Sequence, residues 1–162
     1  MVILGVDPSS KSTGYGLIKV EKGGINHIRS GTIVPQTHLA FYRLLQVIHD
    51  KIEEIIIQHA PEIVALESIF FHKNPKTTIM MGHIRGVILL ICSMYNISIA
   101  EYSPLEVKQA LVGYGRATKH QVSEMVRHFL NIGPIRSNDA SDALAIAICH
   151  FHSAHMKSLG LR

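Results

Sequence analysis

The chain has 162 residues, which is long enough for one domain with a sizeable hydrophobic core. Hydrophobic residues make up 47% and aromatic residues 6%, a composition typical of an α/β protein rich in aliphatic side chains. The formal net charge of +4 favours a polyanionic partner, although many basic proteins bind no nucleic acid. The longest unbroken apolar run in the middle of the chain, Val87 to Cys92, is too short to span a bilayer.

The cysteines and the amino terminus indicate the cellular compartment. Cys92 and Cys149 lie within apolar helical patterns and do not follow the Cys or His spacing of zinc sites, so we expect buried thiols in a reducing compartment. The amino terminus leads directly into a strand, with no basic region or cleavage site that would indicate a signal peptide. A cytoplasmic location is therefore expected.

The first part of the chain predicts three antiparallel strands. Val2 to Val6 is a continuous apolar run that stops at a turn rich in Pro and Ser, which indicates a buried central strand. Tyr15 to Val20 can return antiparallel to it, and Ile25 to Val34 predicts a third strand near a sheet edge because Pro35 ends it. Asp7 therefore stands at the carboxyl end of a buried strand.

A crossover helix and a fourth strand follow. Residues 39–59 carry apolar side chains at helical spacing, and Ile63 to Leu66 is a short buried strand that delivers Glu67 at its carboxyl end. The next helix begins at Pro75 and extends to about Tyr95. Its second half is apolar all round, which leaves two interpretations: one face packs on a second subunit, or the whole helix is buried in the core.

The last third of the chain predicts one strand and three helices. Residues 96–102 form the fifth strand, and Ser103 and Thr118 each open a capping box at the start of a short helix. The last helix begins near Asp139. The predicted fold is thus α/β, with a five-stranded mixed sheet of three antiparallel and then two parallel strands, flanked by helices on both faces.

We expect a single domain over residues 1–155 and a frayed tail over residues 156–162, which are polar and contain glycine. No repeat or low-complexity linker divides the chain.

Four acids are candidates for one site. Asp139 and Asp142 are three residues apart and share one face of the last helix, whose other residues there are small and apolar, as in a helix packed close against a sheet. If that helix crosses the ends of the first and fourth strands, both acids meet Asp7 and Glu67. The alternative is purely structural: Asp7 caps a turn, and the two helical acids favour the positive end of the helix.

Four converging carboxylates would repel one another strongly without divalent cations. Ligand sets made only of oxygen select Mg²⁺ or Mn²⁺ over zinc. Two such ions roughly 4 Å apart activate a water and stabilise the leaving 3′ oxygen during phosphodiester hydrolysis. The pattern therefore predicts a nuclease with two Mg²⁺ ions, or with Mn²⁺ as a substitute.

A series of motifs follows the order of a known family along essentially the whole chain. They are Leu4-Gly-Val-Asp7-Pro8-Ser9-Ser10, Thr13-Gly14-Tyr15-Gly16, Ala65-Leu66-Glu67-Ser-Ile-Phe70, Lys73-Asn74, Gly82-His-Ile-Arg85-Gly86, Pro104-Leu-Glu-Val107-Lys108, Gly113-Tyr-Gly115, Lys119-His-Gln121-Val122 and Asp139-Ala-Ser-Asp142-Ala-Leu-Ala-Ile-Ala. The chain with these motifs resembles the RuvC crossover junction endodeoxyribonucleases, the bacterial Holliday junction resolvases. The resemblance implies a ribonuclease H-like fold, a homodimer that binds a four-way DNA junction, Mg²⁺-dependent nicking of two opposed strands, and the RuvA–RuvB branch-migration complex as a partner.

The resemblance also implies roles for individual residues. The family's catalytic, metal-binding acids fall on Asp7, Glu67, Asp139 and Asp142. Its stacking aromatic falls on Phe70, its phosphate-contacting lysines fall on Lys108 and Lys119, and its dimer helix falls on the stretch from Met81 to Ile91. The chain departs from the family pattern at Ser141, where alanine is common, and at Phe71, which leaves open which of two neighbouring rings stacks.

Basic side chains are concentrated after Glu67, in the half of the chain whose loops should surround the cleft. An aromatic side chain in a loop beside an acid also favours stacking on a base. The alternative for any single lysine is an ordinary solvated charge. The predicted DNA-binding residues are Phe70, Lys73, Lys76, Arg85, Lys108, Arg116 and Lys119.

Two other functions are weighed against a junction nuclease. A small ATPase of the actin/hexokinase-like class shares an opening strand, an acid and a hairpin with glycines, but the chain is short for that class and a second phosphate loop is not found. A non-catalytic junction-binding module has no physical need for four acids at one site.

Overall fold

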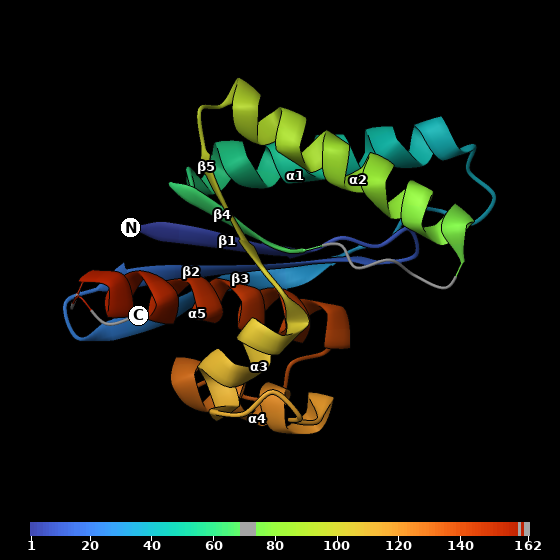
Figure 1. The fold of residues 1–162 in the computed structure, drawn as a ribbon. Coiled ribbons are helices and arrows are strands. Elements are labelled where there is room, and N and C mark those ends of the chain that lie inside the picture. Colours follow the sequence, from blue (N-terminus) through green and yellow to red (C-terminus); the bar gives the residue numbers. More distant parts are fainter. Residues whose placement is uncertain (69–73, 159, 161–162) are drawn as a thin grey trace.

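The computed structural model describes residues 1–68, 74–158 and 160. The chain forms a five-stranded sheet with the strand order β3-β2-β1-β4-β5 (Figure 1). The pairs β1–β2 and β2–β3 are antiparallel, whereas β1–β4 and β4–β5 are parallel, so the predicted mixed sheet is confirmed. The strands are β1 (Val2–Asp7), β2 (Thr13–Glu21), β3 (Gly24–Ile33), β4 (Ile63–Glu67) and β5 (Ser98–Tyr102).

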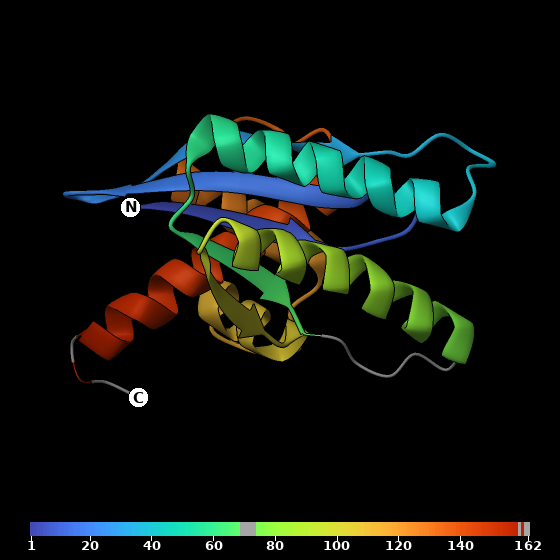
Figure 2. The same cartoon turned by 90° about the horizontal axis from the view of Figure 1, so that it is seen from above.

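Helices cover both faces of the sheet. On one face α1 and α2 lie side by side, and on the other α5 lies against the strands, with α3 and α4 packed on its outer side (Figures 1 and 2). The helices are α1 (Phe41–His59), α2 (Pro75–Met94), α3 (Pro104–Val112), α4 (Lys119–Leu130) and α5 (Asn138–Ser158). Because α5 runs along the central strands, it is the element that brings the end of the chain to its beginning.

The predicted helix starts are confirmed by their caps. At α3 the Ser103 N–H donates to the Glu106 carboxylate over 2.7 Å, and the Glu106 N–H donates back to the Ser103 hydroxyl over 3.2 Å. At α4 the Thr118 N–H donates to the Gln121 side chain over 2.9 Å, with the reciprocal bond at 3.2 Å. These boxes satisfy amide groups that a helix start leaves without partners.

The sheet separates two hydrophobic cores. Ile3 and Leu4 are neighbours in β1 and point to opposite faces, because side chains alternate along a strand. Leu4 joins the core under α1 and α2, which includes Ile52 and Ile88, whereas Ile3 joins the core under α5, which includes Leu144. Both faces of β1 are therefore buried, as its continuous apolar sequence predicts.

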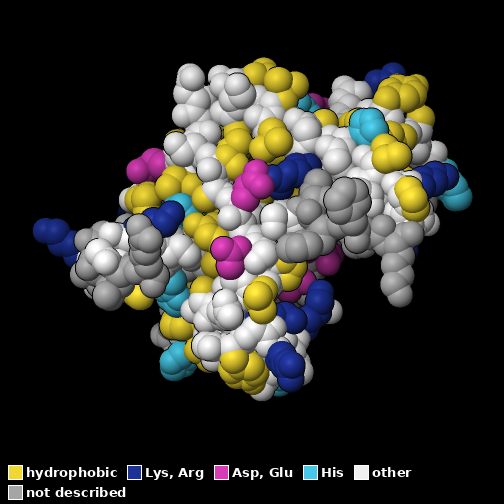
Figure 3. Space-filling view, viewed as in Figure 1, with side chains coloured by type: hydrophobic (Ala, Val, Ile, Leu, Met, Phe, Trp, Pro, Cys, Tyr) yellow, Lys and Arg dark blue, Asp and Glu magenta, His cyan; other side chains and the backbone are white. Residues whose placement is uncertain are grey.

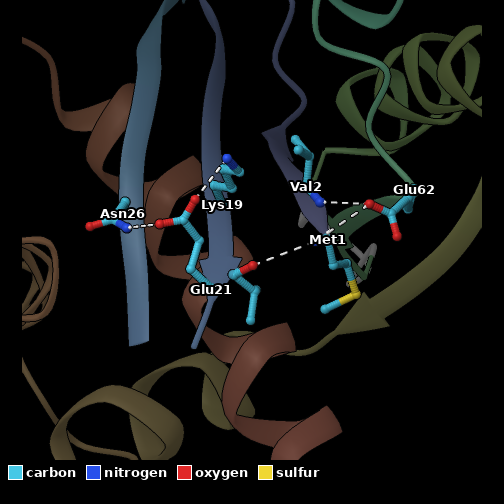
Figure 4. A network of polar contacts seen from close by, with 7 residues as sticks. Met1, Val2, Lys19, Glu21, Asn26 and Glu62 are labelled. Carbon is cyan, nitrogen blue, oxygen red and sulfur yellow. Dashed lines mark hydrogen bonds and ion pairs between the residues drawn. The ribbon is translucent and has the colours of Figure 1, made fainter. Parts of the chain in front are cut away.

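Polar contacts fix the amino-terminal end of the sheet (Figure 4). The Val2 N–H donates to the carboxylate of Glu62, which precedes β4, over 3.0 Å. Within β2, Glu21 pairs with Lys19 at 2.7 Å, and across the hairpin it accepts a hydrogen bond from the Asn26 amide at 3.0 Å. The opposite, carboxyl end of β1 carries Asp7.

Helix α2 has one core face and one exposed apolar face. Ile84, Ile88 and Ile91 are completely buried, whereas Ile79 and Leu90 are mostly exposed. The interpretation of α2 as a fully buried helix is therefore wrong. By length and composition alone α2 could also cross a membrane, and only 28% of its apolar window is buried. Because its core face packs against α1 and the sheet, we interpret the remaining hydrophobicity as an exposed contact face.

The division into a domain over residues 1–155 and a tail over residues 156–162 stays a prediction. Helix α5 itself extends to Ser158.

Candidate active site

Asp7 and Glu67 end two neighbouring parallel strands, β1 and β4. The register pairs Gly5 with Ala65, so two residues later the acids stand side by side. Side chains alternate along a strand, and each acid therefore shares a sheet face with its Gly5 or Ala65 neighbour. That face is covered by α5: a Cβ atom on Gly5 would lie 2.0 Å from the carbonyl oxygen of Ala143, and Ala65 belongs to the core under α5.

Two glycines of β2 let the first turns of α5 lie directly on the sheet. Gly14 pairs with Asp7 in the β1–β2 ladder, and a Cβ atom on Gly14 would lie 2.0 Å from the carbonyl oxygen of Asp139. A Cβ atom on Gly16 would similarly lie 2.6 Å from the Leu144 side chain. Only residues without a side chain leave room for this approach. The approach places the start of α5 over the end of β1.

The acids meet at a cavity of about 280 Å³. Asp7 and Glu67 enter it from the strand ends, and Asp142 enters it from α5. Lys108 of α3 and Lys119 of α4 also line it, and the remaining wall is apolar. Elements from both halves of the chain therefore contribute to one cavity.

The acids act on one another electrostatically. Burial, followed in importance by the negative charges of Glu67, Asp142 and Asp139, raises the pKa of Asp7 to about 7. The positive charge of Lys119 opposes this rise in the pKa. Asp7 is thus close enough to feel the charges of the other three predicted acids, although Asp139 is not among the residues that line the cavity.

A lysine partly balances this negative charge. The Lys119 ammonium lies 2.9 Å from the Asp142 carboxylate, and this bond and its charge raise the pKa of Lys119. The lysine side chain is 79% exposed, so the pair is largely solvated and contributes little stability. Its position matters more, because it places an exposed positive charge in the lining of the acidic cavity.

The donor set fits a hard divalent cation. The side chains lining the cavity that can bind a metal ion are carboxylates, and a cation would offset the negative charge that raises the pKa of Asp7. Within the described part of the chain, no three His, Cys, Asp or Glu side chains already converge as closely as a single ion requires.

The predicted DNA-binding residues fall into different environments. Lys76 and Arg116 are exposed, at the start of α2 and in the loop before α4. Arg85 is instead 11% exposed, donates to the carbonyl oxygen of Glu67 over 3.0 Å and forms an ion pair with Glu101. Its contact with DNA stays a prediction. Three residues named in the sequence analysis lie outside the described residues: Phe70, Phe71 and Lys73.

Acidic and basic side chains lie next to one another on the molecular surface. In the view of Figure 3, Lys and Arg side chains gather beside acidic ones in the region of α3 and α4. This arrangement agrees with the lining of the cavity, where Lys108 and Lys119 face Asp7, Glu67 and Asp142. A polyanion would meet positive charge around the rim and acids at the centre.

Two features of the site are not predicted from the sequence. The first is the contact of α5 with strand glycines, although Gly14 and Gly16, at alternate positions and with Gly5 opposite Gly16, are a signal of close approach. The second is the pair of Arg85 and Glu101, which has no local signal because the residues come from α2 and β5.

Comparisons with known proteins agree with this architecture. The family model described as crossover junction endodeoxyribonuclease RuvC matches residues 3–150. The crossover junction endodeoxyribonuclease RuvC of Syntrophomonas wolfei is 45% identical over 159 residues, which is 98% of this chain and 92% of the relative. Among solved structures, Thermus thermophilus RuvC has a TM-score of 0.89 at 31% identity over 97% of both chains. The same protein in complex with a Holliday junction substrate has a TM-score of 0.88 at 28% identity over 96% of both chains.

The structural matches confirm the ribonuclease H-like fold that the sequence motifs imply. The family model spans almost all of the chain, and the curated relatives align over nearly their full length. The chain therefore belongs to the RuvC family of crossover junction endodeoxyribonucleases.

Proposed function

We propose that this protein is a Holliday junction resolvase. It is a structure-selective endonuclease that nicks two opposed strands of a four-way DNA junction during homologous recombination and repair. The observation that carries the proposal is the cavity where Asp7 and Glu67, from adjacent strand ends, face Asp142 of α5. Membership of the RuvC family supports the choice of a four-way junction as substrate.

Two divalent cations are part of the proposal. Asp7, Glu67, Asp139 and Asp142 would hold them, with Mg²⁺ as the working ion and Mn²⁺ as a substitute. When bound, the ions activate a water and stabilise the leaving 3′ oxygen of the cleaved phosphodiester. The raised pKa of Asp7 supports this assignment, because a cation offsets the cost of its charge.

The basic residues near the cavity bind and orient the DNA backbone. Lys108 and Lys119 line the cavity and are placed to contact phosphates next to the cleaved bond. Lys119 can exchange Asp142 for a phosphate, since both are anionic partners for its ammonium group. Lys76 and Arg116 are exposed and would contact phosphates farther away.

The assembly and the compartment are inferred from the same family. Because resolving a junction requires nicks on two opposed strands, we infer a homodimer that brings two copies of this cavity to the junction. The exposed apolar face of α2 supports this assembly. The proposal also includes a contact with the RuvA–RuvB branch-migration complex and a cytoplasmic location.

The direct test is cleavage of an end-labelled immobile four-way junction beside a linear duplex of the same sequence. Each substrate is incubated with Mg²⁺ and, separately, with a chelator. We expect paired nicks on opposed strands of the junction alone, and only with the metal. Equal cutting of the duplex would exclude structure selectivity, and tight junction binding without cutting would support a non-catalytic module. A thermal shift with nucleotides and no action on DNA would favour an ATPase.

An active-site variant assigns the cleavage to this cavity. Asp7→Asn removes a metal ligand but leaves the basic rim intact, so junction binding should persist while the cleavage rate falls by at least about 100-fold. Asp50→Asn is the matched control, because Asp50 is an exposed acid of α1 outside the cavity. Cleavage by Asp7→Asn at the wild-type rate would exclude this site.

A further inference from the structure

Arg85 connects helix α2 to the end of strand β4. One guanidinium nitrogen, Nη1, donates to the carbonyl oxygen of Glu67 over 3.0 Å. The other, Nη2, forms an ion pair with the carboxylate of Glu101 in β5. The Arg85 side chain is only 11% exposed, so these bonds form in a partly dry environment where they are stronger than at the surface.

The carbonyl group that Arg85 binds belongs to the peptide bond between Glu67 and Ser68. The N–H of this peptide, on Ser68, donates to the carbonyl oxygen of Tyr102 over 2.8 Å. Strand β1 ends beside Glu67, and its next residue, Pro8, has no N–H to donate toward β4. A side chain from α2 therefore binds the last carbonyl of β4, and both polar groups of the peptide have partners.

We propose that Arg85 is a positioning residue for the candidate catalytic acid Glu67. By holding the Glu67 carbonyl, it fixes the backbone from which the carboxylate enters the cavity. Arginine suits this role because its planar fork serves two acceptors at once, whereas a lysine offers a single nitrogen. The inference rests on the proposed nuclease function and extends it from the cavity to a helix outside it.

Glu101 is the second partner of the Arg85 guanidinium. Its carboxylate lies on β5, one residue before Tyr102, and neutralises the guanidinium that would otherwise be a nearly buried charge. The Glu67 carbonyl and the Glu101 carboxylate bind the two terminal nitrogens of the Arg85 guanidinium. Little of this group therefore remains available to bind a phosphate. The positioning role and a direct DNA contact therefore predict different behaviour for variants.

The test compares Arg85→Met and Arg85→Lys with Arg29→Met. Arg29 is an exposed arginine of β3 that donates to Gln58 over 3.0 Å, so its variant also loses one positive charge and one hydrogen bond. Junction affinity is measured in chelator, and the single-turnover cleavage rate is measured with Mg²⁺ at saturating protein. We expect Arg85→Met to cut about 10- to 100-fold more slowly, as for other residues that orient metal ligands, with affinity within about twofold of wild type.

Two further readouts separate positioning from other roles. Arg85→Lys keeps the positive charge but has one terminal nitrogen in place of two, so its cleavage rate should stay well below that of the wild type. Amide hydrogen exchange over residues 63–68 should accelerate in Arg85→Met and not in Arg29→Met, whether or not DNA is cut. Glu101→Gln, which keeps the shape of the side chain, should slow cleavage in the same direction and serves if Arg85→Met does not fold.

Specific outcomes would overturn the inference. Unchanged cleavage and exchange in Arg85→Met would show that the bond to Glu67 positions nothing. If Arg85→Lys cleaves at the wild-type rate, or if Arg85→Met loses junction affinity without a change in cleavage rate, Arg85 acts as a DNA contact. If wild-type protein does not cut junctions, the proposed function fails, and accelerated exchange alone then supports only the structural bond.

Discussion

The carboxyl group of Asp7 is costly to charge in the folded protein. Burial and the neighbouring acids raise its pKa to about 7, from an ordinary value of 3.8. An acid whose pKa is raised by folding stabilises the folded state fully below its unfolded pKa, and this contribution is lost as the pH rises through the folded pKa. Metal-free protein should therefore lose stability between pH 4 and about 7.

We predict a pH-dependent gain in stability for Asp7→Asn. In chelator at pH 8 the wild-type carboxylate is charged in the folded state, whereas asparagine is not, so the variant should be more stable. Between pH 5 and pH 8 the wild type should lose roughly 2–3 kcal/mol of unfolding free energy relative to the variant. Urea denaturation at the two pH values measures this difference.

Glu124→Gln is the control for this measurement, because Glu124 is an exposed acid whose ion-pair partner, Arg127, keeps its charge at both pH values. Excess Mg²⁺ at pH 8 should stabilise the wild type more than Asp7→Asn, since the ion binds the folded state. A stability difference that is the same at pH 5 and pH 8 would contradict the raised pKa.

At the scale of elements, α5 depends on the strand glycines. The backbone at Asp139 and Ala143 lies where side chains of Gly14 and Gly5 would be, so this helix cannot approach a sheet with larger residues there. The same approach sets how far Asp139 and Asp142 reach toward Asp7. The contact between α5 and the strand glycines therefore determines both the packing of this helix and the positions of its acids.

We predict that Gly14→Ala impairs both stability and cleavage. Its Cβ atom would lie 2.0 Å from the Asp139 carbonyl oxygen, which is backbone and can move only with the helix. Overpacking of this kind costs about 1–3 kcal/mol, and the displaced acids should lower the cleavage rate as well. Thermal unfolding and the junction assay measure the two effects.

Gly133→Ala is the matched control, because a Cβ atom there would meet nothing within 4 Å. It should leave stability and cleavage close to wild type. A Gly14→Ala protein that is as active as Gly133→Ala would show that the start of α5 does not set the position of the acids.

At the scale of the whole molecule, the exposed face of α2 is the candidate dimer contact. Ile88 is completely buried and belongs to the core, so a charge at this position would unfold the chain and would not report on assembly. Leu90 is 58% exposed on the other face, one helical turn from the exposed Met94, and Ile79 is exposed on the same side about three turns nearer the start of the helix. An apolar stripe of this kind fits a two-fold contact between copies of the chain.

We predict that Leu90→Glu yields folded monomers. The charged side chain would be buried without a partner in the dimer but solvated in the monomer, which shifts the equilibrium toward the monomer. Analytical ultracentrifugation measures the mass, and circular dichroism checks the fold. Paired nicking should fall with the dimer population.

Ile57→Glu is the control for assembly, because Ile57 is an equally exposed apolar residue on α1, at 66% exposure. It should leave the mass unchanged. A Leu90→Glu protein that remains dimeric would place the contact on another surface.

Local patterns in the sequence predict most of the elements and supply the candidate acids of the site. Continuous apolar runs predict β1 and β4, helical spacing predicts α1, and the capping boxes at Ser103 and Thr118 predict where α3 and α4 begin. These signals are local, because each depends on residues close together in the chain. They also place Asp7 and Glu67 at strand ends, where parallel strands bring side chains to one edge of the sheet.

Only the tertiary structure decided how these parts act on one another. The contact of α5 with Gly5 and Gly14, the raised pKa of Asp7 and the bond from Arg85 to Glu67 join residues far apart in the chain. Distance, burial and the pairing of charges arise only when the elements pack. The alternate glycines Gly14 and Gly16 signal a close approach in the sequence, but they do not identify the helix that makes it. The division of α2 into a core face and an exposed face was likewise decided by its position over the sheet.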